Sequence, residues 1–264
     1  MKAIIKWSLK QRRHSIFWWS LAAFGLIFIN MIFYPTFKDQ AAQLQKSFES
    51  LPEATLQFIG GSSDFFSPVG FLNSQIYFLM LPLILGVLAI GLGSSLLARE
   101  EQDKTIEALL ARPNSRTHVL LSKALVGGII LAITTLVSLV TTAITAKMVK
   151  LDVSSLRIIL ATLACFLLVL CFAAIAFMLT SFGRARSASI GIATTFSLGG
   201  YIISSLSGTV SWLQTPSKFF PFYYYQPEAI LRGTYNWLHV LFFIGVIAVA
   251  GVLSWISFRH RDIG

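Results

Sequence analysis

Six long stretches of this chain contain no Asp, Glu, Lys or Arg, and they constrain its fold more than any other feature. They cover residues 14–37, 65–98, 124–146, 158–183, 187–217 and 233–258. Each stretch is longer than the ~20 residues with which a helix crosses ~30 Å of hydrocarbon. Soluble domains and disordered chains do not contain six such segments. The sequence therefore predicts an all-α, polytopic membrane protein with six transmembrane helices.

The boundaries of these helices follow from where charge and apolar character change. We expect a single transmembrane domain over residues 1–264, with helices at 15–34, 73–97, 119–146, 158–181, 187–206 and 238–258. Pro82 should kink the second helix, because proline removes a backbone donor. The aromatic and proline-rich segment around 208–237 is predicted to be an interfacial or re-entrant element.

Residues 1–13 are predicted to form an amphipathic helix lying in the membrane surface. Lys2, Lys6, Lys10 and Arg13 fall on one side of a helix, where their charges can face lipid phosphates. An irregular basic tail is the alternative interpretation of this segment.

The distribution of basic residues predicts the orientation. Six spans place both termini on one side, and 14 of the 21 Lys and Arg residues lie on that side. Because basic loops are retained inside, we expect both the N- and the C-terminus to be cytoplasmic. Lipid headgroups and topology then explain the net charge of +10, and no nucleic-acid partner is predicted.

The sequence has few of the groups that membrane catalysis or ion coupling requires. It contains neither the phosphate-binding loop of P-loop ATPases nor the H-E-x-x-H motif of zinc proteases. The six stretches carry no Asp or Glu that could couple transport to protons or sodium. We therefore predict that the chain is not an enzyme, with no catalytic, cofactor-binding or metal-binding residues, and that energy for any transport comes from elsewhere.

The loop between the second and third helices carries the strongest functional signal. Its acidic residues lie close together at Glu100, Glu101, Asp103 and Glu107. The i, i+4 spacing of Glu100 and Lys104 favours a helix. Ile106, Leu109 and Leu110 would give this helix a small apolar face. These features alone leave two interpretations open, a docking site for a soluble partner or a surface helix packed on lipid.

The run from Arg99 to Arg116, followed by Lys123, resembles the signature loop of type-2 ABC transporter permeases. In that family an acidic pair precedes Gly-Thr, Glu, two leucines, Pro and Ser-Arg, and a Lys enters the third helix. The chain matches at Glu100, Glu101, Thr105, Glu107, Leu109, Leu110, Pro113, Ser115, Arg116 and Lys123. It differs at Lys104, where the family commonly has Gly.

This resemblance implies a permease that pairs with a second permease chain, identical or different, and with two cytoplasmic ATP-binding subunits. Those subunits would bind ATP and Mg, and this chain would bind no cofactor. The loop would be a cytoplasmic coupling helix seated in a groove of the ATPase. Its docking residues would be Glu100, Glu101, Thr105, Ile106, Glu107, Leu109, Leu110, Pro113 and Arg116, and Lys123 would mark the entry to the third helix.

The function implied is ATP-driven export across the bacterial cytoplasmic membrane by a multi-pass subunit. Largely apolar helices favour an amphipathic or hydrophobic substrate. An ATP-independent secondary carrier or channel is the alternative interpretation, and a membrane enzyme or scaffold is a further one.

Overall fold

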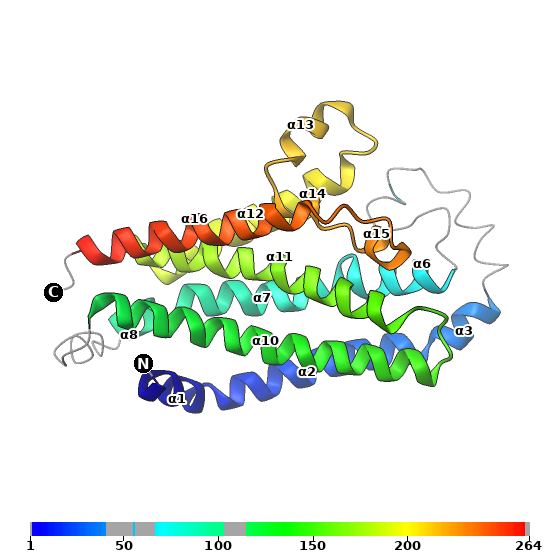
Figure 1. The fold of residues 1–264 in the computed structure, drawn as a ribbon, viewed down its shortest axis with the longest axis horizontal. Coiled ribbons are helices and arrows are strands. Elements are labelled where there is room, and N and C mark those ends of the chain that lie inside the picture. Colours follow the sequence, from blue (N-terminus) through cyan, green and yellow to red (C-terminus); the bar gives the residue numbers. More distant parts are fainter. Residues whose placement is uncertain (1, 41–54, 56–66, 103–114, 262–264) are drawn as a thin grey trace.

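A computed structural model describes residues 2–40, 55, 67–102 and 115–261. This part of the chain is helical, without a β-strand, and its long helices run side by side in an elongated bundle (Figure 1). The elements are α1 (Lys2–Gln11), α2 (Arg13–Ile32), α3 (Tyr34–Asp39), α6 (Pro68–Leu72), η1 (Asn73–Tyr77), α7 (Met80–Ser95), α8 (Ala98–Gln102), α10 (Arg116–Met148), α11 (Ser155–Ser181), α12 (Arg186–Leu206), η2 (Ser211–Leu213), α13 (Gln214–Ser217), α14 (Pro221–Tyr224), α15 (Pro227–Arg232) and α16 (His239–His260).

Within the described residues, six helical segments are long and apolar enough to cross a membrane, which confirms the predicted number. They are Arg13–Asp39, Pro68–Ser95, Arg116–Met148, Ser155–Ser181, Arg186–Leu206 and His239–His260. The third begins at Arg116 rather than at 119, because Ser115 caps it. The Ser115 hydroxyl accepts the backbone N–H of His118 at 3.2 Å, as expected of a serine N-cap.

Helix α11 forms the centre of the bundle and packs against α7, α10, α12 and α16. Its closest neighbour is α7, and glycine makes their approach possible. A Cβ atom at Gly93 would overlap the carbonyl oxygen of Ala173 and contact the Cβ of Ala176. Small residues are used in this way where membrane helices approach closely.

The outer helices present large apolar side chains to the surroundings. Phe17 and Trp18 of α2 are 59% and 63% exposed, and Leu241 of α16 is 63% exposed. In water such surfaces would be unfavourable, but the acyl chains of a bilayer cover them without penalty.

The second span is broken where proline requires it. The helix is interrupted at Phe78 and Leu79, and Phe78 lies four residues before Pro82, where the proline ring meets the preceding turn. Before the break, η1 is a π-helix in which Phe78 N–H donates to Asn73 O at 2.7 Å. The hydroxyl of Tyr225 donates to the carbonyl of Tyr77 at 2.7 Å, so a side chain stabilises the backbone beside the kink.

The segment between α12 and α16 folds back against the helices. Phe220 packs against Phe196, with 5.1 Å between ring centroids, and lies where a Cβ of Gly200 would be. Phe196 is ten residues before the end of α12 at Leu206, which corresponds to roughly 15 Å along the helix. The aromatic segment therefore reaches below the end of the span.

Tyrosine hydroxyls satisfy the backbone of this segment. Tyr235 donates to Tyr224 O at 2.9 Å, and Tyr224 donates to Lys218 O at 3.0 Å. Burial raises the pKa of Tyr235 to about 12. Arg157 donates to Leu231 O at 2.9 Å and holds α15 against α11.

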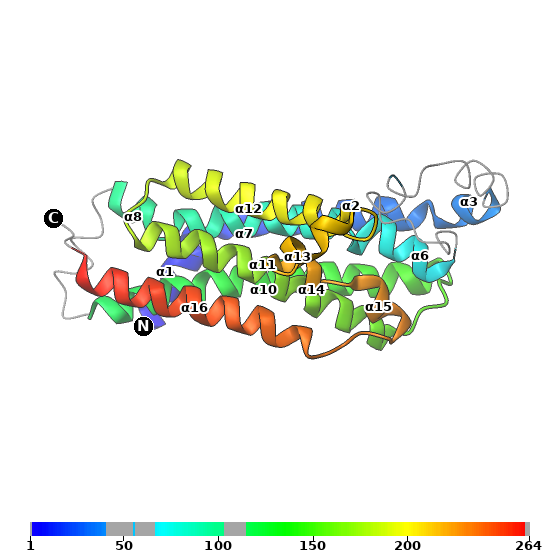
Figure 2. The same cartoon turned by 90° about the horizontal axis from the view of Figure 1, so that it is seen from above.

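The bundle has two distinct ends. Helix α1, α8, the start of α10 and the end of α16 lie together at one end, which we call the α1 end (Figures 1 and 2). Helices α3, α6 and α15 lie at the opposite end, which we call the α15 end. The first and last described residues therefore lie at the same end of the bundle, as expected for an even number of spans.

Candidate functional site

The structure describes only part of the predicted docking loop. Thr105, Ile106, Glu107, Leu109, Leu110 and Pro113 lie outside the described residues. Glu101 belongs to α8, but its side chain also lies outside them. Glu100, Arg116 and Lys123 are described, and they lie at the two points where the chain enters and leaves this loop.

Glu100 and Lys123 form a buried ion pair. Lys123 Nζ lies 2.5 Å from Glu100 Oε1, and the two side chains are only 2% and 11% exposed. Sequence reasoning placed Lys123 at a helix entry. The structure places it two turns inside α10, roughly 10 Å from Arg116. Removing one partner of such a pair leaves an uncompensated buried charge, at a cost of about 3–5 kcal/mol.

Helix α1 completes the surroundings of Lys123. Lys123 Nζ donates to Ser8 Oγ at 3.3 Å and lies 5.5 Å from the ring centroid of Trp7. Ser8 is 2% exposed, whereas Lys2, Lys6 and Lys10 lie on exposed positions of the same helix. The predicted basic face is therefore directed away from the bundle, and the opposite face binds α10.

A second contact joins the start of the first span to the end of the second. Arg12 donates to Ser95 Oγ at 3.1 Å. Burial lowers the pKa of Arg12, and the charge of nearby Arg99 lowers it further, whereas Glu100 raises it. The Glu100 carboxylate thus balances basic groups from the α1–α2 junction, α8 and α10 within one cluster. We call Trp7, Ser8, Arg12, Glu100 and Lys123 the root cluster.

Arg116 contacts the end of α16 within this chain. Its guanidinium donates to the backbone carbonyls of Arg259 and Arg261 at the end of α16. Trp255 of α16 donates to Thr117 Oγ1 at 3.1 Å. A cation at a helix C-terminus satisfies unpaired carbonyls and opposes the helix dipole. Arg116 therefore joins the start of α10 to the end of α16.

The root cluster connects the helices on both sides of the predicted loop. Glu100 follows the second span, Lys123 lies two turns inside the third, and Ser8 precedes the first, so one set of contacts joins three spans. Sequence reasoning missed Trp7, Ser8 and Arg12 as members of this site. Their signal was their position on the side of the first helix that lacks lysine.

Comparison with known proteins shows the family of the chain but does not bear on the contacts of the root cluster. A model of the family described as ABC-2 family transporter protein matches residues 3–263. None of the curated proteins compared with the chain matches it. The family match covers all six spans and the loop between the second and third, and it confirms the resemblance seen in that loop. The chain therefore belongs to the ABC-2 family of transporters, as a multi-pass permease subunit of the cell membrane of the kind that pairs with an ATP-binding subunit.

Proposed function

We propose that this chain is the permease of an ATP-driven exporter and that a separate ATP-binding subunit docks on residues 100–116. The observation that carries the proposal is the buried pair of Glu100 and Lys123, which joins α8 to α10 on either side of that segment. Because the pair links the second span to the third, a movement of the docked subunit would shift both helices together. The energy for transport would then reach the chain through its contact with the docked subunit, and not through protonation of a side chain within the membrane.

The charge distribution supports a cytoplasmic location for the α1 end. This end carries the N-terminal lysines, the docking segment and the end of α16, and 14 of the 21 Lys and Arg residues belong to it by sequence. Basic loops remain on the inner side of the membrane. A soluble ATP-binding subunit is also found on that side.

The exposed face of α12 supports pairing with a second permease chain. Ser187, Gly191 and Thr195 follow one another at i, i+4 spacing and are exposed. A Cβ at Gly191 would meet nothing within 4 Å, so the stripe is accessible within this chain. Small residues let another helix approach closely. Two permease chains, identical or different, would engage two ATP-binding subunits, which bind ATP and Mg, while this chain binds no cofactor.

The positions of acidic residues within the described spans support an energy source outside this chain. Among the described spans, Asp and Glu occur only at an end, at Asp39. Proton- and sodium-driven carriers use acidic groups near mid-membrane. Apolar spans also favour an amphipathic or hydrophobic substrate.

Introducing charge at Leu109 and Leu110 tests the docking proposal. We expect the double variant Leu109→Asp, Leu110→Asp to insert normally but to lose co-purification with the ATP-binding subunit, because carboxylates would be desolvated in an apolar groove. The matched control is Leu109→Met, Leu110→Met, which keeps apolar character and volume and should retain the complex. Undiminished co-purification and transport in the aspartate variant would contradict the proposal and favour the carrier interpretation.

A further inference from the structure

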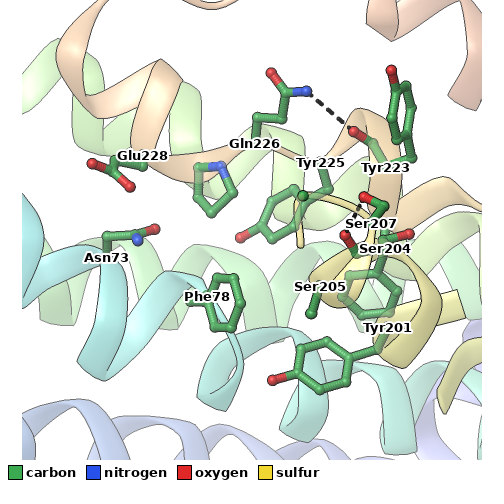
Figure 3. Close-up of a pocket in the computed structure, with 13 residues that line it drawn as sticks. Asn73, Phe78, Tyr201, Ser204, Ser205, Ser207, Tyr223, Tyr225, Gln226 and Glu228 are labelled. Carbon is green, nitrogen blue, oxygen red and sulfur yellow. Dashed lines mark hydrogen bonds between the residues drawn. The ribbon is translucent and has the colours of Figure 1, made fainter. Parts of the chain in front are cut away.

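A cavity of about 380 Å³ lies near the α15 end of the bundle (Figure 3). Its walls come from the start of the second span, the last turns of α12 and the α14–α15 segment. Figure 3 shows Asn73 and Glu228 on one side of the view and Ser204, Ser205 and Ser207 on the other. The volume lies within the ~300–1,000 Å³ of small-molecule sites.

Contacts between the walls hold the cavity open in a fixed shape. The Tyr225 hydroxyl donates to the backbone carbonyl of Tyr77 at 2.7 Å. Within the α14–α15 segment itself, the Gln226 amide donates to Tyr223 O at 3.2 Å. Phe222 packs edge-on against Tyr201, with 5.5 Å between centroids. The kink of the second span, the end of α12 and the aromatic segment are thus fastened to one another around the cavity. Binding would not have to order these walls.

The charge of the lining excludes strongly ionic ligands. Within the described part of the chain, no Lys, Arg or His lines the cavity, and Glu228 is its one carboxylate. Glu228 is paired with Arg232, at 2.9 Å between Oε1 and Nη2. A phosphate or carboxylate would find no cationic partner here, and an ammonium group would have to compete with Arg232 for the carboxylate. A neutral ligand fits best.

The neutral groups of the lining suit a ligand with many hydroxyls. Ser204 Oγ is buried and has no hydrogen-bond partner within the described residues, so it is ready to bond a group in the cavity. Asn73 and Gln226 offer amides that both donate and accept. Phe78 and Phe222 supply apolar ring surface. A sugar presents hydroxyls together with the C–H groups of its own ring, so both kinds of lining group match its surface.

We propose that this cavity binds a neutral glycosyl group. Because the cavity lies at the last turns of α12, where a span reaches the membrane surface, the glycosyl group of a glycolipid is positioned to enter it. That the bound glycolipid is also the exported substrate rests on the proposed function, whereas the binding itself does not. The residues assigned to recognition are Ser204, Asn73 and Gln226 for hydroxyls, and Phe78 and Phe222 for the ring face.

Binding can be measured on the purified chain in phosphatidylcholine nanodiscs by native mass spectrometry, with diglucosyl diacylglycerol as the probe. Ser204→Leu, which removes the hydroxyl and places a larger apolar side chain in the cavity wall, should abolish saturable binding. Ser204→Ala should weaken it about fivefold, the effect of one neutral hydrogen bond. The matched control is Ser211→Leu, at an exposed serine that does not line the cavity, and it should bind as the unaltered chain does.

Further measurements distinguish a free sugar from a glycolipid headgroup, and they separate the glycosyl-binding proposal from the docking proposal. Competition by free maltose would support a site for the sugar alone, and absence of competition together with saturable glycolipid binding would support a headgroup site. Phosphatidylglycerol binding equal to that of the glycolipid, or glycolipid binding unchanged in Ser204→Leu and Ser204→Ala, would overturn the proposal. Co-purification of the ATP-binding subunit should be unaffected by these variants, so a failure of docking would be seen independently.

Discussion

At the scale of single residues, the charge on Lys123 is stabilised by contacts from two other helices, α1 and α8. We expect Lys123→Met to lower the free energy of unfolding by about 3–5 kcal/mol, because Glu100 would remain buried without its partner. Thermal unfolding in detergent measures this. Lys147→Met is the control, since Lys147 is an exposed lysine of the same helix and such changes stay within about 0.5 kcal/mol. Equal stability of the two variants would contradict the assignment.

The pairing of Glu100 with Lys123 could not be predicted from the sequence, although the loop resemblance identified both residues. Which side of α10 faces the bundle depends on the rotation of the helix about its axis. In water an apolar stripe fixes that rotation, but a span that is apolar on all sides has no such stripe. The contact from Ser8 to Lys123 spans 115 residues, and no local pattern specifies it.

At the scale of elements, the closeness of α7 and α11 depends on a single glycine. Gly93→Ala should destabilise the protein by about 1–3 kcal/mol, because the new methyl would overlap the backbone of Ala173, which cannot rotate away. Gly91→Ala, in the same helix, meets nothing within 4 Å and should be neutral or stabilising by up to about 1 kcal/mol through helix propensity. Thermal unfolding of the two variants separates the effect of helix packing from the effect of helix propensity. A Gly93→Ala variant as stable as the Gly91→Ala variant would contradict the role of Gly93 in packing.

The membrane-spanning helices were largely predictable, because a helix that crosses hydrocarbon needs a long segment without charged residues. The absence of charge identified all six spans, and Pro82 correctly indicated a kink in the second. The π-helix at Asn73–Tyr77 was not predicted, since it depends on how the chain adapts before the proline. The position of Phe220 along α12 could not be predicted either, because it is set by the contact of Phe220 with Gly200 on that helix.

At the scale of the whole molecule, the proposed coupling contacts and the proposed ligand site lie at opposite ends of the bundle. The root cluster lies at the α1 end, and the glycosyl cavity lies near the α15 end. Helix α10 runs from Arg116 to Met148 and α11 packs along it, so long helices join the two regions. Under the proposed function, these helices would carry the movement from one region to the other.

The central claim, that a nucleotide-binding partner moves this chain, can be tested by measuring distances between spin labels. Labels at Gln102→Cys and Arg184→Cys would lie at exposed positions of the α1 end, in a background of Cys165→Ala and Cys171→Ala. The account predicts that ATP changes the measured distance only when the ATP-binding subunit is present. A change in the chain alone, on adding ATP or a proton gradient, or no change in the assembled complex, would contradict it.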